Sequence, residues 1–377
     1  MSDHPQIYGF CPDRFGAVRK VFTQNFASGL EGGARFALAH RSKIIIDLYG
    51  GHADRARTKA FDDQTLTPVF STTKLLAGLM IARLVDQELL AYDQTVASIW
   101  PAFAAEGKGA ITVAQVLSHQ AGLCGIAKAF DPALWFDWDL ICEKLAAMAP
   151  IWTPGTASGY HPITVGYLIG EIFRRVDGRT LGTALREDLA EPHDLDLWIG
   201  LPDSEHERCA DMQRPTAMPD LSEITEPRRV AFGTRWAAPL GRESAQWRRF
   251  EIPSGNGHAT APALARIMAL LADNGQLDGQ ALLSPGTAAQ VIQERIGGPD
   301  RVLPRQVSWA AGPMRNSLEP VFGPSPSIVG HYGWGGSCAF ADPQTGLSGA
   351  YVMTRQSVHL VGDPRATALI EAVYQSL

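Results

Sequence analysis

The chain has 377 residues, of which 45% are hydrophobic, and a formal net charge of −6 at pH 7. This length can bury a large core and predicts two lobes rather than one. The acidic balance gives no overall basic character to attract nucleic acid or anionic lipid, so we expect neither a nucleic-acid nor a membrane partner.

The N-terminus and the cysteines favour a cytoplasmic protein. The first residues lack the basic and apolar regions of a signal peptide, and no apolar run approaches the ~20 residues that span a bilayer. The 5 cysteines are scattered and never spaced as Cys-x-x-Cys, which predicts reduced packing residues. No His-x-x-x-His pair occurs, so we expect no metal and no other cofactor. The oligomeric state stays open.

The first elements predict a helix followed by a hairpin. Residues 12–30 carry apolar side chains at helical spacing up to about Gly29. Two apolar runs, 35–40 and 44–49, flank a polar turn and predict paired strands. Residues 52–68 are polar and irregular.

The segment from Phe70 to Lys74, followed by an apolar helical run to Leu90, is the most informative stretch. Ser71 suits a helix N-terminus, and Lys74 lies one turn along the same face. A serine nucleophile needs an adjacent base, and a lysine among apolar neighbours has its charged form disfavoured. Ser-x-x-Lys is a motif of penicillin-recognising acyl-transfer enzymes, although a simple helix cap gives the same pattern. Of the seven lysines, only Lys74 has a serine three positions before it.

The middle of the chain is predicted to be mainly helical. Residues 112–123 predict a helix capped by Gly122, with His119 at its end either as a site residue or bonded to backbone. The aromatic residues at 135, 136 and 138 indicate either core or the wall of a substrate cleft. Residues 152–162 form a loop, in which Tyr160 points into a cleft or packs underneath, and a helix follows from Ile163 to Arg174.

The last third returns to strands. Residues 200–255 are predicted to form a long connection. Residues 254–258 predict a turn, in which His258 is a turn or capping residue. Residues 262–271 predict a helix. Four strands are predicted over 306–313, 327–332, 338–342 and 347–354, before a closing helix over 365–377. The fold class is therefore α+β: residues 1–68 and 255–377 form one domain around an antiparallel sheet, residues 69–254 form an inserted, mainly helical domain, and the active site lies in the cleft between them.

A second informative stretch, rich in glycine, runs from Gly330 to Ser337. Its glycines let backbone amides approach a ligand closely, as an oxyanion hole requires, although a β-bulge at a sheet edge gives the same pattern. With Ser71-x-x-Lys74, Tyr160 and His331-Tyr332-Gly333 in this order, the chain resembles the serine β-lactamase and penicillin-binding-protein superfamily. Within it, the chain is most similar to the class C β-lactamase-like carboxylesterases, often called family VIII esterases. Residues 111–123 and 256–261 resemble further landmarks of that family.

The resemblance implies a β-lactamase/transpeptidase-like fold and a role for each matching residue. Ser71 would be the acylated nucleophile, and Lys74 and Tyr160 the pair that moves protons. The third motif would be His331-Tyr332-Gly333, or Trp334-Gly335-Gly336 in a shifted match. The amides of Ser71 and Trp334 would form the oxyanion hole. The set of oxyanion and substrate-binding residues is then Trp334, His331, Gly333, Tyr332 and His161.

Two departures from the family pattern favour ester substrates. Pro162 and His331 stand where β-lactamases of this class have asparagine and lysine, which hold the lactam amide and carboxylate. We therefore expect a serine carboxylesterase that cleaves short-chain, neutral esters. The alternatives are a β-lactamase or D-amino-acid peptidase, an acyltransferase and a non-catalytic relative. Two near matches to Gly-x-Ser-x-Gly, at Ser337 and Ser348, lack the final glycine.

Overall fold

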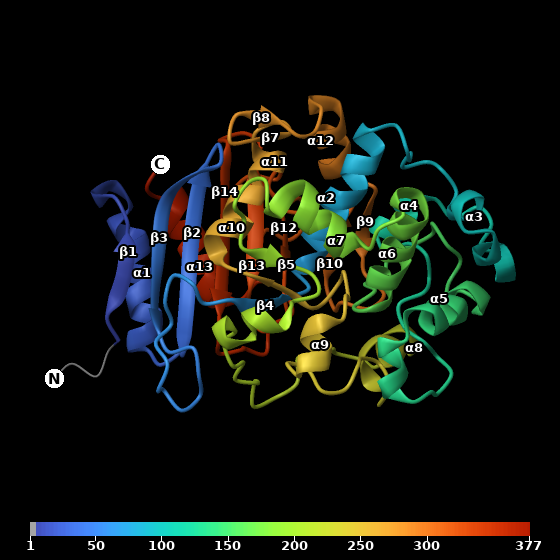
Figure 1. Ribbon diagram of the computed structural model, residues 1–377, viewed down its shortest axis with the longest axis horizontal. Helices are drawn as coiled ribbons and strands as arrows, with labels where there is room; N and C mark the ends of the chain where they lie inside the picture. Colours follow the sequence, from blue (N-terminus) through green and yellow to red (C-terminus); the bar gives the residue numbers. More distant parts are fainter. Residues whose placement is uncertain (1–4) are drawn as a thin grey trace.

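The computed structural model describes residues 5–377, and both ends of this stretch enter one large sheet (Figure 1). Within that range the sheet has nine strands, all antiparallel, in the order β1-β3-β2-β14-β13-β12-β11-β10-β9. The predicted α+β class and the union of both chain ends are thus confirmed. The strands are β1 (Ile7–Phe10), β2 (Gly33–His40), β3 (Lys43–Gly51), β9 (Ile296–Pro299), β10 (Gln306–Trp309), β11 (Met314–Arg315), β12 (Val329–Tyr332), β13 (Cys338–Asp342) and β14 (Leu347–Met353).

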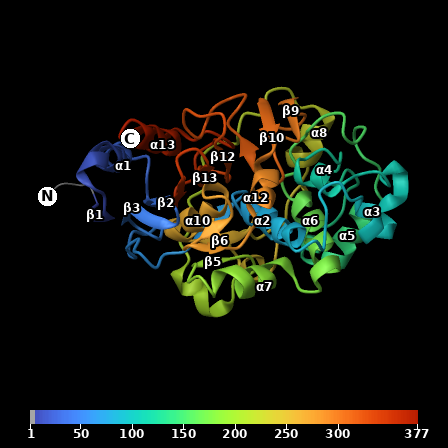
Figure 2. The ribbon, with the colours of Figure 1, turned by 90° about the horizontal axis from the view of Figure 1, so that it is seen from above.

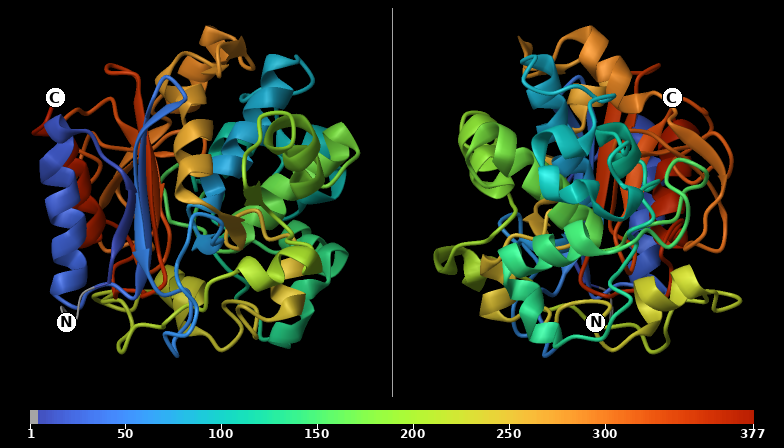
Figure 3. Two further views of the ribbon diagram at one scale, coloured as in Figure 1. Left: turned by 60° about the vertical axis from the view of Figure 1, so that its left-hand side comes forward. Right: turned by 90° about the vertical axis from the view of Figure 1, so that its right-hand side faces the viewer.

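Helices cover both faces of this sheet (Figure 3). Helices α1 (Gly16–Ala27) and α13 (Pro364–Tyr374) pack side by side on one face, and α10 (Ala261–Ile267) packs on the other against β2 and β14. Because β2 is covered on both faces, almost all of its residues are buried. Its pairing with β14, from Leu347 opposite His40 to Met353 opposite Ala34, joins the two ends of the chain.

The helices of the middle of the chain gather beyond α10, at the end of the molecule opposite α1 and α13 (Figure 1 and Figure 2). Helix α2 is buried along most of its length and packs against α6, which explains why its sequence is apolar all round. The helices of this part are α2 (Thr73–Asp86), α3 (Val96–Ile99), η2 (Pro101–Gly107), α4 (Val113–Leu117), η3 (Pro132–Phe136), α5 (Trp138–Ala147), α6 (Thr164–Asp177), α7 (Leu181–Leu185) and η4 (Arg186–Ala190). The division into two domains at residues 68/69 and 254/255 stays a prediction.

A small sheet that the sequence did not reveal lies beside the large one. It joins β4 (Thr67–Phe70), β6 (Gly257–Ala259) and β5 (Leu197–Trp198) in the order β4-β6-β5. The predicted turn at 254–258 is therefore wrong at its end, because Gly257 and His258 are in a strand. Such short strands are defined by long-range pairing, and their sequences are too short to show an alternating pattern.

Two helix boundaries also differ from the prediction. The helix expected to reach residue 123 ends at Leu117, because His119 and Gly122 adopt positive φ angles of 60° and 73°. The helix expected over 262–271 is divided at Met268 into α10 and α11. The remaining elements are η1 (Asp13–Phe15), η5 (Asp203–Arg208), α8 (Glu226–Arg228), η6 (Arg229–Gly233), α9 (Ala245–Arg249), α11 (Ala269–Ala272), β7 (Gln276–Leu277), β8 (Gln280–Ala281) and α12 (Pro285–Ile292).

Two further features concern the cysteines and the helices. The thiols of the cysteines are free, as predicted: Cys11, Cys124, Cys142, Cys209 and Cys338. Of the helices within residues 5–377, none combines the length and the apolar character needed to cross a bilayer.

Candidate active site

Ser71 lies in the tight turn between β4 and the start of α2. The preceding residue, Phe70, has φ +47°, a left-handed conformation that is strained for a bulky side chain. The Thr73 hydroxyl donates to the carbonyl of Phe70 and accepts from the amide of Gly257 at 2.9 Å. A side chain at 257 would meet Thr73, since a Cβ there would lie 2.7 Å from the hydroxyl oxygen. Strand β6 therefore holds the strained turn that presents Ser71.

Lys74 is buried directly beneath Ser71. Its Nζ lies 3.1 Å from Ser71 Oγ and donates to the carbonyls of Pro162, at 2.9 Å, and Ser254, at 2.8 Å. Within residues 5–377 no carboxylate pairs with it, and burial lowers the pKa of Lys74 well below its usual value. A neutral amine has two N–H groups and one lone pair. The two carbonyls take the N–H groups, so the lone pair is left for the Ser71 hydroxyl.

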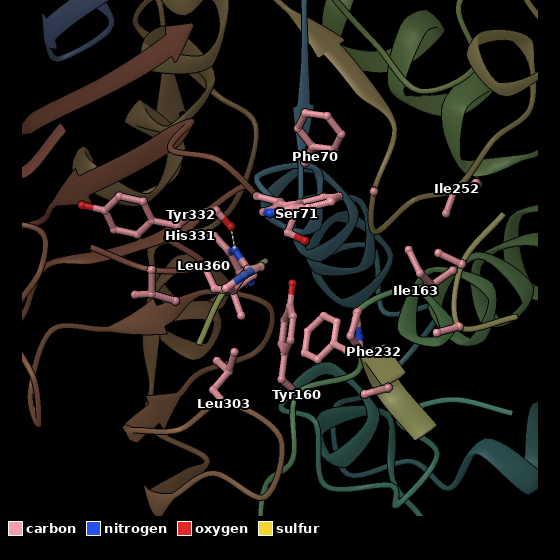
Figure 4. Close-up of a pocket in the computed structure, with 18 of the residues that line it drawn as sticks. Phe70, Ser71, Tyr160, Ile163, Phe232, Ile252, Leu303, His331, Tyr332 and Leu360 are labelled. Carbon is pink, nitrogen blue, oxygen red and sulfur yellow. Dashed lines mark hydrogen bonds between the residues drawn. The ribbon is translucent and has the colours of Figure 1, made fainter. Parts of the chain in front are cut away.

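Tyr160 approaches Ser71 from the opposite side of the cavity, with its hydroxyl directed toward the serine (Figure 4). Burial raises the pKa of Tyr160, and a hydrogen bond with Ser71 opposes that rise, so Tyr160 is protonated at neutral pH. Lys74 Nζ lies 4.7 Å from the centroid of the Tyr160 ring. The sequence prediction that Tyr160 points into a cleft is the alternative that the structure bears out.

Asp300 fixes the loop that carries Tyr160, and no motif in the sequence marked it. Its Oδ1 accepts from the amide of Tyr160 at 2.9 Å, and its Oδ2 accepts from Trp309 Nε1 at 3.1 Å. The Trp309 ring is stacked on the Tyr160 ring, with 5.8 Å between centroids and an interplanar angle of 3°. Asp300 thus sets both the backbone of Tyr160 and the ring behind it.

Three buried histidines, His119, His161 and His331, lie near Tyr160, and burial lowers the pKa of each. The pKa of His161 and of His331 falls to about 3, so both are neutral at pH 7. His161 donates from Nδ1 to the carbonyl of Gly159 at 2.6 Å and accepts at Nε2 from the amide of Leu123 at 2.9 Å. The resemblance placed His161 among the substrate-binding residues, whereas here both ring nitrogens are bonded to backbone and its role is to hold the Tyr160 loop.

His119 completes this group, and sequence reasoning understated its importance. Its Nδ1 accepts from the amide of His161 at 3.1 Å, as expected for a histidine bonded to backbone. Its ring packs edge-on against Tyr160, 5.0 Å between centroids. Among residues 5–377, no group of three or more His, Cys, Asp or Glu side chains is placed to hold a metal ion.

The third motif lies at the end of β12, facing β4. His331 donates from Nδ1 to the carbonyl of Tyr332 at 2.7 Å, which leaves Nε2 as a buried acceptor. The Tyr332 hydroxyl donates to the carbonyl of Val321 at 2.8 Å and points away from Ser71 (Figure 4). A side chain at Gly333 cannot fit, because a Cβ would lie 2.2 Å from the carbonyl oxygen of Val69. His331 and Tyr332 are on the strand, whereas residues 334–336 form the turn after it.

Two backbone amides at the cavity are free to bind a ligand. Within residues 5–377, neither the amide of Ser71 nor that of Trp334 donates to a protein acceptor. The carbonyl of Trp334 accepts from Gln356 Nε2 at 2.9 Å, and the next carbonyl, that of Gly335, accepts from Arg365 Nη2 at 2.8 Å. The loop is thereby clamped with the Trp334 amide left unpaired, as an oxyanion hole requires.

Ser71, Tyr160, His331 and Trp334 line one cavity of about 160 Å³. The rest of its lining is mostly apolar and includes Phe70, Ile163, Leu221, Phe232, Trp247, Ile252, Leu303 and Leu360 (Figure 4). The aromatic cluster at 135–138 lies elsewhere: Trp135 is core, and Phe136 packs against Phe250. The wall that faces Ser71 comes instead from residues 218–242, a segment without periodic signals in the sequence.

The two serines of the near matches to Gly-x-Ser-x-Gly are structural. Ser337 Oγ donates to the carbonyl of Val69 at 2.9 Å, and Ser348 Oγ donates to that of Ala265 at 2.6 Å. Both residues are fully buried. Ser337 ties the loop after β12 to the end of β4, and neither serine has a neighbouring base.

Comparisons with known proteins agree with this geometry. The beta-lactamase family model matches residues 18–373. The curated esterase/beta-lactamase LipL of Mycobacterium tuberculosis is 34% identical over 369 residues, which are 93% of this chain and 83% of LipL.

Solved structures are similar over the whole length. A penicillin-binding protein homologue from Caulobacter crescentus shares 61% identity with a TM-score of 0.97, covering 99% of this chain and 100% of its own. A family VIII carboxylesterase shares 38% identity with a TM-score of 0.92, again covering 99% and 100%. With a serine and a tyrosine in one cavity and a buried lysine beneath the serine, the chain belongs to the beta-lactamase family of serine hydrolases and is related to the family VIII carboxylesterases.

Proposed function

We propose that the protein is a carboxylesterase that cleaves short-chain carboxylic esters through an acyl-enzyme on Ser71. The observation that carries this proposal is the buried amine of Lys74, 3.1 Å from Ser71 Oγ and bonded to two carbonyls. Such an amine is a base ready to accept the serine proton. The names of LipL and of the family VIII structure support ester hydrolysis.

Acylation begins with Ser71 Oγ attacking the ester carbonyl carbon. The proton of Ser71 passes to Lys74, with Tyr160 sharing it, and the carbonyl oxygen becomes an oxyanion held by the amides of Ser71 and Trp334. The tetrahedral intermediate then collapses, the C–O bond to the alcohol breaks, and the Lys74–Tyr160 pair returns the proton to the leaving alkoxide. Lys74 and Tyr160 titrate as a coupled pair, so the proton belongs to the pair.

Deacylation repeats the same steps with water. The Lys74–Tyr160 pair takes a proton from water as its oxygen attacks the acyl carbon, and the same two amides hold the oxyanion. Collapse then breaks the bond to Ser71 Oγ, which regains its proton as the acid leaves. Every proton that is taken up in one half of the cycle is returned in that half.

The geometry at His331 supports esters over lactams. Its Nδ1 proton is committed to the carbonyl of Tyr332, so its lone pair at Nε2 offers no charge to a carboxylate. The Pro162 carbonyl is bonded to Lys74, and proline has no N–H to donate. Phe70 and Trp334 flank Ser71 with ring centroids 6.3 Å apart, which favours small acyl groups next to the nucleophile.

The test compares kcat/KM for nitrophenyl acetate, butyrate and laurate with that for nitrocefin and a cephalosporin. We expect short esters to exceed lactams by ~10²–10³-fold, because two polar contacts to the lactam are missing. Ser71 should gain the acyl mass in a rapidly quenched reaction. H331K should raise lactam turnover modestly. Wild-type nitrocefin turnover equal to that of acetate would overturn the ester preference.

The second candidate is lactam hydrolysis by the same site. It is favoured by the names of LipL, an esterase/beta-lactamase, and of the penicillin-binding protein homologue. The same substrate comparison decides between the two, because both reactions use Ser71.

A further inference from the structure

Arg242 carries a positive charge into a cavity wall that is otherwise apolar. Of the described residues that line the cavity, it is the one with a permanent charge, because His331 is neutral. Its Cζ lies 4.0 Å from the centroid of the Trp334 ring, which makes a cation–π contact. Arg242 thus contacts Trp334, whose backbone amide holds the substrate's carbonyl oxygen in the proposed mechanism.

The guanidinium of Arg242 has no acceptor within the protein. Across residues 5–377, no hydrogen bond and no ion pair joins it to a carboxylate, a carbonyl or a hydroxyl. The adjacent Glu243 does not pair with it, because its Oε2 accepts from the amide of Met212 at 3.0 Å. Arg242 is only half-buried and its nitrogens reach the open part of the cavity, so its donors are available to an occupant that supplies acceptors.

The electrostatic surroundings of Arg242 point the same way. Burial lowers the pKa of Arg242 to about 10, and the nearby positive charge of Arg214 adds to that effect. Arg242 is still charged at pH 7, and Arg214 forms no ion pair within the described residues. Glu243 opposes the effect of Arg214, so the positive charge at the cavity is that of Arg242 itself, and it attracts an anion.

The stacking leaves the hydrogen-bonding edge of Arg242 available. The Trp334 ring contacts the guanidinium as a charge, and the N–H donors of Arg242 form no hydrogen bond within residues 5–377. A carboxylate accepts two parallel bonds from such an edge, a geometry that lysine cannot reproduce. The apolar residues around it, including Leu221 and Trp247, offer contact to a short hydrocarbon chain.

We propose that Arg242 binds a carboxylate of the substrate, so that the preferred esters carry an acid group joined to the ester by a short apolar spacer. Half-esters of dicarboxylic acids have this chemistry. The inference rests on the proposed esterase function and narrows its substrate class.

The experiment compares mono(4-nitrophenyl) glutarate with 4-nitrophenyl valerate, two esters of equal chain length that differ in the terminal carboxylate. The measured quantity is the ratio of their kcat/KM values in the wild type, R242Q, R242K and R186Q. The last variant is the matched control, because Arg186 lies over the ring of Trp198 at 3.6 Å, outside this cavity. We expect R242Q to lower the ratio about tenfold to a hundredfold, R242K to lower it less, and R186Q to leave it unchanged.

A binding measurement separates this inference from the esterase proposal. Calorimetric titration of the S71A protein with glutarate should show binding that R242Q in the same background loses, whether or not any ester is hydrolysed. An unchanged ratio in R242Q, or equal glutarate affinity with and without Arg242, would overturn the inference. If no nitrophenyl ester were turned over while glutarate bound through Arg242, the esterase proposal would fail and the anion site would stand.

Discussion

The two walls of the cavity are built in different ways. On one wall, Tyr160 and His331, together with Lys74 beneath Ser71, are at most 5% exposed, and most of their polar atoms are bonded within the protein. The facing wall comes from the connection between β5 and β6. There Met218 is 70% exposed, and Arg242 has no hydrogen-bond or ion-pair partner among residues 5–377.

The first wall holds the groups that react, and the second wall holds the groups that select the substrate. Reacting atoms must be held within a fraction of an ångström, so the turn that carries Ser71 and the loop that carries Tyr160 are fixed by surrounding hydrogen bonds. Apolar contacts are non-directional and tolerate small displacements. We therefore expect substitutions in the first wall to change kcat strongly, and substitutions in the second to change the choice of substrate by smaller factors.

The largest effect is expected from S71A. Removing the nucleophile should lower kcat by at least about 10⁴-fold and abolish acyl-enzyme formation, with an unchanged circular dichroism spectrum. Steady-state kinetics on nitrophenyl acetate and mass spectrometry measure these outcomes. An S71A protein with most of the wild-type turnover would show that another residue is the nucleophile.

Lys74 and Tyr160 should behave as one unit. K74A and Y160F should each lower kcat about 10²–10⁴-fold, because each breaks the same path for the Ser71 proton. The double variant should be little worse than either single variant. Losses that add in log kcat would argue that the two residues act separately.

The first wall could be predicted from the sequence because its parts are short contiguous motifs. Ser71-x-x-Lys74 lies within one helical turn, and the glycine-rich stretch after β12 indicates that backbone amides can approach a ligand closely. Asp300 and Gln356 were missed because their effect depends on contacts with residues distant in the chain. Nothing in the periodicity or composition of residues 218–242 indicates which side chains face Ser71, and Arg242 is one arginine among many.

The clamp on the oxyanion loop can be tested at Gln356. Its Nε2 holds the carbonyl of Trp334, so Q356A should let the adjacent peptide rotate and lower kcat about tenfold with little change in KM. The control is Q306A on β10, where the side chain is exposed. A Q356A protein whose loss appears in KM alone would place Gln356 in substrate binding instead.

The burial of His331 should appear in the pH dependence of stability. Its pKa is lowered from 6.5 to about 3, so below pH 6.5 the unfolded chain binds a proton that the folded chain does not. Stability is therefore lost as the pH falls from about 6.5 toward about 3. H331Q should reduce the loss between pH 7 and pH 5 by about 2 kcal/mol, measured by urea unfolding. An equal loss in both proteins would mean that His331 is protonated in the folded state.

The smallest effect is expected in the second wall, at Phe232. This side chain lies next to Tyr160 in the cavity (Figure 4), and F232A should make room for longer acyl chains. We expect the ratio of kcat/KM for octanoate to that for acetate to rise about three- to tenfold, because one hydrophobic contact discriminates by only about 1 kcal/mol. F136A is the matched control, since Phe136 packs against Phe250 and not in the cavity. If F136A shifted the chain-length preference and F232A did not, the aromatic cluster at 135–138 would be the selecting wall, as one reading of the sequence suggested.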